Sequence, residues 1–147
     1  MKIIIDTNVI FSALLNSNGK IADLIFNSQE TFEFYSCSYM RYEIRKHWEK
    51  LKKISKLNNE QIEESRDKIF SQIRFINEEI IQEKIWRSSE RLVHNVDADD
   101  IAFIALTTFL KGHLWTGDME LYNGLKLKGY DKILTTQELL AIRNYKM

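Results

Sequence analysis

Two acidic residues in this sequence follow short apolar segments of the kind that form buried strands. Asp6 comes directly after residues 3–5, which are all isoleucine, and Asp118 follows residues 114–116 with Gly117 in between. A carboxylate at the end of a buried strand costs free energy unless it is paired or lies in a solvated cleft. In open α/β sheets, binding sites gather at the carboxyl ends of the strands. We therefore expect both acids in one site.

Other acidic residues are positioned to join this site. Glu43 falls in the first turns of a helix expected after a strand at 32–36, and Asp97, Asp99 and Asp100 precede an apolar helix expected over 101–110. Each position also has a purely structural explanation. Asp99 suits a helix N-cap, Asp97 a solvated loop, Glu43 an exposed helix face, and Asp118 a turn.

Several carboxylates gathered at one site imply a particular chemistry. Acids within about 4–6 Å of each other repel, so some must bind protons unless a cation lies between them. Ligation by oxygen alone favours Mg²⁺ or Mn²⁺. Such an ion lowers the pKa of a bound water and stabilises charge on a phosphodiester during hydrolysis. The acids therefore suggest metal-assisted cleavage of phosphodiester bonds.

Strands and helices alternate along the chain in the order that would bring these acids together. The expected strands and helices are 2–5, 9–15, 20–28, 32–36, 101–110, 113–116, 119–128, 132–135 and 136–143. This alternation predicts βαβ units and a central parallel sheet of four to five strands, covered by helices in a three-layer, Rossmann-like α/β/α fold. The first strand is apolar throughout, which places it centrally.

Between about 39 and 93 the apolar spacing is helical, and we expect an elaboration on one side of the sheet. One helix is predicted around Ile44, Trp48 and Leu51. A second follows the break at 57–59, and a third comes before 93. The apolar positions assigned to the second and third helices are Ile62, Ile69, Ile73 and Ile76, then Ile81, Ile85 and Leu92.

Length and composition limit the class of protein. The chain has 147 residues, which favours a single domain over 1–147. Lys and Arg total 21, as do Asp and Glu, so the net charge is zero and a generic, strongly basic nucleic-acid binder is disfavoured. Cys37 is the single cysteine, which indicates a reducing compartment, and no apolar stretch has the length of a membrane span. We expect a cytoplasmic protein.

The order and spacing of these residues resemble the PIN domain family, including its VapC-like toxins. The resemblance covers nearly the whole chain. It depends on Asp6-Thr7-Asn8 at the start, Glu43 in the middle, Asp97-Ala98-Asp99-Asp100 before an apolar helix, and Thr116-Gly117-Asp118 before another helix. The Lys-Ile-Leu-Thr-Thr-Gln-Glu-Leu segment at 132–139 is similar to the usual ending of the family.

The resemblance implies a Mg²⁺- or Mn²⁺-dependent endoribonuclease, a hydrolase of RNA phosphodiester bonds. It implies that Asp6, Glu43, Asp100 and Asp118 are the family acids, with Asp97 and Asp99 as alternatives for the third. Thr116 matches a hydroxyl that supports the metal site, and Asn8 is placed to orient Asp6. Many small members are toxins that are held inactive by an antitoxin and are often homodimers, so RNA, an antitoxin and a second copy are the expected partners.

The sequence leaves a second function open, namely a module with the same fold and an idle acidic pocket that binds RNA or protein. Intact acids at all four positions argue against it. A cluster of basic residues beside Glu43 includes Arg41, Arg45 and Lys46, which could contact RNA phosphates or form a solvated helix face.

Overall fold

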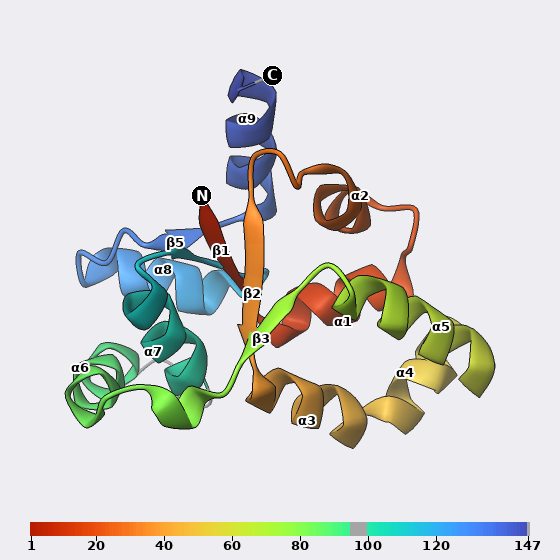
Figure 1. The fold of residues 1–147 in the computed structure, drawn as a ribbon, viewed down its shortest axis with the longest axis horizontal. Coiled ribbons are helices and arrows are strands. Elements are labelled where there is room, and N and C mark those ends of the chain that lie inside the picture. The colour runs from red at the N-terminus through yellow and green to blue at the C-terminus, as the bar shows by residue number, and fades with distance from the viewer. Residues whose placement is uncertain (95–99, 147) are drawn as a thin grey trace.

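A computed structural model of the protein describes residues 1–94 and 100–146. Five parallel strands form one sheet in the order β3-β2-β1-β4-β5 (Figure 1). The strands are β1 (Lys2–Ile5), β2 (Glu33–Cys37), β3 (Arg74–Ile76), β4 (His113–Trp115) and β5 (Ile133–Leu134). The predicted parallel sheet of four to five strands is confirmed.

Strand β1 lies at the centre of the sheet, as its sequence predicts. Ile3 is in register with Phe34 of β2 on one side and His113 of β4 on the other. The side chains of residues 3–5 are fully buried because helices cover both faces of the sheet. The chain builds one half of the sheet before crossing to β4, so the order of strands reverses beside the carboxyl end of β1. This is where open α/β sheets place their sites.

Two helical layers enclose the sheet. The helices are α1 (Thr7–Leu15), α2 (Lys20–Asn27), α3 (Ser38–Lys46), α4 (Trp48–Ser55), α5 (Asn59–Phe70), α6 (Glu83–Val93), α7 (Ile101–Leu110), α8 (Met119–Leu127) and α9 (Thr136–Lys146), with a 3₁₀ turn at Glu78–Ile80. Helix α1 packs with α2, α3, α4 and α5 on one side, whereas α7 packs against β1, β2 and β4 and against α6 on the other (Figure 1). The three-layer α/β/α architecture is confirmed.

The predicted elaboration at 39–93 is largely helical, but it contains a strand. Ile73 and Ile76 were predicted on the second helix, and this is wrong. Helix α5 ends at Phe70, Ile73 lies in the turn that follows it, and Ile76 belongs to β3, which pairs with β2 at the edge of the sheet. A strand of three residues is too short to show an alternating pattern, so the helical spacing continued through it by coincidence.

The first predicted helix of this region divides into α3 and α4 at His47. Helix α5 then begins with a capping box at the predicted break. The Asn58 side chain accepts a hydrogen bond from the Gln61 amide at 2.8 Å, and the Gln61 side chain accepts one from the Asn58 amide at 3.0 Å. This reciprocal cap satisfies amides that a helix start leaves unpaired. The Trp48 indole donates to Asn59 at 2.6 Å, which holds α4 against the start of α5.

No single helix in the described part of the chain is both long and apolar enough to cross a membrane. The pair α1 and α2 would reach the necessary length and apolarity together, but the two helices are bent by 107°.

Candidate active site

The carboxylate of Asp6 lies at the carboxyl end of β1, between the sheet and the start of α1. Its amide donates to the Trp115 carbonyl at 3.1 Å, which extends the pairing of β1 with β4 by one residue. Only 4% of Asp6 is exposed. Its side chain does not cap α1. The strand therefore fixes the position of the carboxylate, and the fold surrounds it.

Thr116 joins the ends of β1 and β4. Its hydroxyl donates to Asp6 Oδ2 at 2.8 Å and accepts a hydrogen bond from the Asp118 amide at 3.0 Å. Asp118 Oδ1 accepts hydrogen bonds from the amides of Glu120 and Leu121, at 3.0 and 3.1 Å, and so caps α8. The structural alternative expected for Asp118 was a turn. The structure shows a helix cap instead, which engages one of the two carboxylate oxygens.

Asn8 contacts the loop after β4 instead of Asp6. Its side-chain oxygen accepts a hydrogen bond from the Gly117 amide at 3.1 Å. We expected Asn8 to orient Asp6, but the contact shows that it positions the loop carrying Asp118. Asp6 is oriented by Thr116 instead. The residue type alone could not separate these two functions, because an amide side chain can serve either partner.

Glu43 reaches the site from α3. The Thr7 hydroxyl donates to Glu43 Oε1 at 2.5 Å, which ties α3 to the first residue of α1. Thr7 is buried and follows Asp6 directly. The structure thus brings Asp6, Glu43 and Asp118 to one edge of the sheet from three separate elements.

The environment of Asp6 disfavours its ionised form. Burial, with smaller contributions from the negative charges of Glu43 and Asp118, raises the pKa of Asp6 to about 6 from its ordinary value of 3.8. The hydrogen bonds from the Thr116 hydroxyl and the Thr7 amide oppose this shift. A buried carboxylate that repels its neighbours would be stabilised by a cation placed between them.

Asp100 immediately precedes α7, a helix that packs against β1 and β4. It is 8% exposed, and its side chain makes no capping hydrogen bond at the start of the helix. Asp97 and Asp99, the alternatives for the third acid, lie outside the described residues.

The donor set agrees in type with a divalent cation. Asp6, Glu43 and Asp118 offer only oxygen ligands, the kind preferred by Mg²⁺ and Mn²⁺. Within residues 1–94 and 100–146, however, no three His, Cys, Asp or Glu side chains stand together in a ready-made metal site. The Thr7 hydroxyl engages Glu43 Oε1, one of the two oxygens of that carboxylate.

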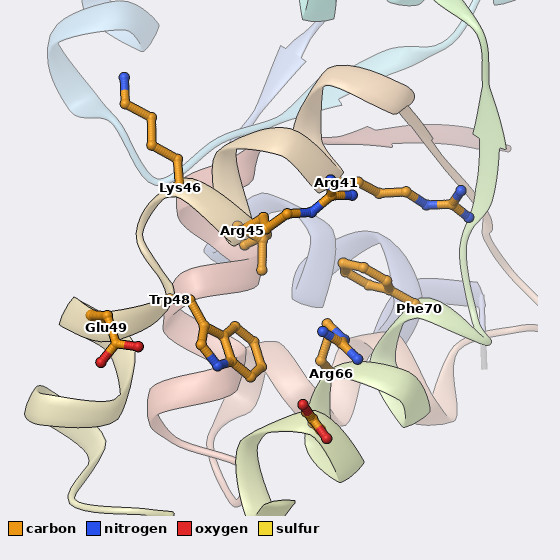
Figure 2. Close-up of a pocket in the computed structure, with 9 residues that line it drawn as sticks. Arg41, Arg45, Lys46, Trp48, Glu49, Arg66 and Phe70 are labelled. Atoms are coloured by element: carbon orange, nitrogen blue, oxygen red, sulfur yellow. The ribbon is translucent and has the colours of Figure 1, made fainter. Parts of the chain in front are cut away.

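Arg41 and Arg45, each two residues from Glu43, lie on another side of α3, whereas Lys46 follows Glu43 by three residues and lies on the same side as Glu43. Arg41, Arg45 and Lys46 line a groove of about 530 Å³ between α3, α4 and α5 (Figure 2). Sequence reasoning missed Arg66 and Phe70, which α5 contributes to this groove. They lie about twenty residues further along the chain, and no local pattern links them to Glu43.

The fold and the three converging acids define a class of protein, an α/β protein with an acidic site at the switch point of a parallel sheet. The sequence profile of the PIN domain matches residues 4–138. The chain belongs to the PIN domain family.

Solved structures show the same fold. VapBC2 from Rickettsia felis, bound to a DNA fragment from its promoter, contains a chain 14% identical, with a TM-score of 0.66, covering 92% of this chain and 97% of that one. A toxin–antitoxin complex from Klebsiella pneumoniae contains a chain that is 16% identical, with a TM-score of 0.59. The match covers 90% of this chain and 96% of that chain. No curated protein sequence is a significant match.

Proposed function

We propose that the protein is a Mg²⁺- or Mn²⁺-dependent endoribonuclease that hydrolyses RNA phosphodiester bonds. The proposal depends mainly on one observation. The buried Asp6 carboxylate lies at the switch point of the sheet, within electrostatic reach of Glu43 and Asp118. Burial and repulsion between these carboxylates lower the stability of the fold. Acids with pKa values perturbed in this way are concentrated in functional sites. Membership of the PIN domain family supports a nuclease function.

In this proposal Asp6, Glu43 and Asp118 hold the cation, with Asp100 as the fourth acid. A bound divalent ion would lower the pKa of a water and stabilise charge on the phosphate. In hydrolysis, the water oxygen forms a bond to phosphorus, the phosphorus–oxygen ester bond breaks, and the leaving oxygen takes up a proton. Thr116 positions Asp6 and the Asp118 backbone together, and Asn8 holds the loop between them.

The proposed biological role is that of a toxin with a cognate antitoxin. The Klebsiella pneumoniae structure with this fold is a toxin–antitoxin complex, and the Rickettsia felis structure with this fold is VapBC2 bound to promoter DNA. The proposal further expects a cytoplasmic homodimer. Light scattering would measure the mass of the purified chain, and co-expression with the product of the adjacent gene would test for the antitoxin.

The decisive experiment is cleavage of a mixed RNA pool with Mg²⁺ or Mn²⁺, in parallel with EDTA and with Asp6→Asn. Asp131→Asn is the matched control, because it makes the same substitution in an exposed acid just before β5, at the opposite edge of the sheet. Cleavage that requires both the metal and Asp6 supports the proposal.

A second measurement separates an idle module from a nuclease. Mn²⁺ should raise the melting temperature of the wild type and of Asp131→Asn but not that of Asp6→Asn. Absence of both cleavage and metal stabilisation would contradict the nuclease proposal and favour a non-catalytic PIN domain.

A further inference from the structure

The groove between α3, α4 and α5 combines positive charge with aromatic rings. Its lining includes four basic side chains, Arg41, Arg45, Lys46 and Arg66, together with Trp48 and Phe70. Figure 2 shows Arg45 and Arg66 gathered near the two rings, whereas Lys46 and Glu49 point away from them. The basic residues come from α3 and α5, so only the folded protein assembles the groove.

The cations of α3 are not neutralised by the protein. In the part of the chain that the structure describes, Arg41, Arg45 and Lys46 form no ion pair. The two acids in the groove have other partners, since Glu49 pairs with Lys52 at 3.0 Å and Glu63 accepts a hydrogen bond from Asn59 at 2.8 Å. The lining therefore has more basic than acidic side chains, which favours the binding of an anion.

The aromatic residues are held in place and are partly accessible. Trp48 and Phe70 are half-buried. The Trp48 indole is fixed by its bond to Asn59, and the Arg66 guanidinium lies 5.0 Å from the centre of the Trp48 ring. The Arg41 guanidinium lies 3.9 Å from the centre of the Phe75 ring. Preorganised rings beside arginines are the combination that binds single-stranded nucleic acids, with phosphates on the cations and bases on the rings.

The groove and the acidic site share helix α3. Arg41 and Arg45 flank Glu43 in sequence, and at 3.6 residues per turn they project away from the side on which Glu43 meets Thr7. A helix with its side chains is about 10–12 Å across, so one helix width separates the two sites. A strand of RNA crossing α3 would occupy both.

We propose that this groove binds a single-stranded segment of RNA next to the bond that the acidic site cleaves. The assignment of that RNA as substrate rests on the proposed ribonuclease function, whereas RNA binding to the groove is measured without cleavage. Single-stranded RNA fits better than an acidic peptide, because a peptide would use the cations and leave the rings without a partner. It also fits better than duplex RNA, whose stacked bases cannot reach the rings.

The test is binding of labelled single-stranded oligouridine to Asp6→Asn protein in EDTA, so that no cleavage occurs. The double change Arg41→Ala, Arg45→Ala should weaken binding about tenfold and lower the slope of log affinity against log salt by about 1.4, which corresponds to two phosphate contacts. The matched control is Lys2→Ala, Lys132→Ala, which removes two exposed cations at the amino ends of strands while giving the same net charge. It should bind RNA as the parent protein does.

Trp48 provides a local signal. RNA should change the tryptophan emission of the parent protein, and Trp48→Phe should remove most of that change while Trp86→Phe does not. Equal weakening by the two double variants, or an unchanged affinity of the groove variant, would overturn the proposal. Binding of an oligoglutamate peptide in the groove without binding of RNA would overturn it in favour of a protein partner.

The two proposals fail in different ways. If the wild type cleaves RNA with metal while the groove variant binds RNA normally, the groove proposal is wrong and the nuclease proposal stands. If the groove binds RNA as described but the wild type with metal cleaves none, the nuclease proposal is wrong and the groove belongs to an RNA-binding module.

Discussion

The acidic edge of the sheet and the basic groove beyond α3 are built in opposite ways. Asp6 is almost completely buried and held by strands at the centre of the sheet, whereas Arg41 and Arg45 are exposed on a helix of the outer layer. Charge at the edge is unfavourable and fixed by the fold. The positive charges in the groove are exposed to solvent, and their positions depend on helices α3 and α5 of the outer layer. We infer that the fold preserves the chemistry in the first region and leaves selection of RNA to the second.

The largest effect should come from Asp6→Asn. Loss of the central carboxylate should reduce metal-dependent RNA cleavage by about a thousandfold or more, on the scale of losing a principal electrostatic contact to the reacting group. RNA affinity in EDTA should stay within about twofold of wild type, since the groove supplies most phosphate contacts. Single-turnover cleavage and fluorescence anisotropy measure the two quantities. Equal loss of cleavage and affinity would mean that the acidic edge contributes to RNA binding as well as to catalysis.

The same substitution should stabilise the protein without metal. Because burial raises the pKa of Asp6 to about 6 from 3.8, the folded state holds the proton more tightly than the unfolded state. The cost of ionising Asp6 is absent below pH 4, grows as the pH rises to about 6, and is fully present above it. Asp6→Asn removes up to about 3 kcal/mol of this cost.

Thermal melting in EDTA measures this difference. Asp6→Asn should melt several degrees above wild type at pH 8, and the gap should close as the pH approaches 4. Asp131→Asn, at an exposed position, should show no such gap at either pH. A variant less stable than wild type at pH 8 would indicate that the carboxylate has a structural role.

Thr116→Val should test how the edge positions its acids. It removes the hydroxyl that binds Asp6 and the Asp118 amide, so cleavage should fall about 10- to 100-fold, the range for a hydrogen bond to a charged group. The Thr116 bond lowers the pKa of Asp6, so the acidic limb of the pH–rate profile should also move to higher pH. Thr116→Ser, which keeps the hydroxyl, should retain the wild-type cleavage rate and the wild-type pH–rate profile. A loss of rate with an unchanged profile would argue for a general packing defect.

The sequence predicts the acidic edge better than the groove for a physical reason. Asp6 follows an apolar strand directly and Asp118 follows one within three residues, so their positions depend on local order along the chain and on the direction of parallel strands. Thr116 was assigned to the same site through the resemblance to the PIN domain family. The contact of Asn8 with Gly117 could not be predicted, because it depends on the course of a loop.

The groove depends on tertiary structure that no local pattern specifies. Arg41 and Arg45 were identified near Glu43, but the break between α3 and α4 at His47 was hidden by continuous helical spacing. The strand β3 was hidden in the same way. Both features determine how α5 returns to α3, and therefore place Arg66 and Phe70 beside the arginines.

The smallest predicted effect concerns the length of the RNA. A substrate of a few nucleotides reaches the acidic edge alone, whereas a longer single strand also crosses α3 into the groove. Arg41→Ala, Arg45→Ala should therefore raise KM for long RNA by about five- to tenfold, leave kcat unchanged, and leave kcat/KM for the shortest substrate unchanged. The control Lys2→Ala, Lys132→Ala should leave KM and kcat unchanged for both the long and the short RNA. If the groove variant slowed cleavage of short and long RNA equally, the arginines would act on the acidic edge itself, and the separation between the two regions would be wrong.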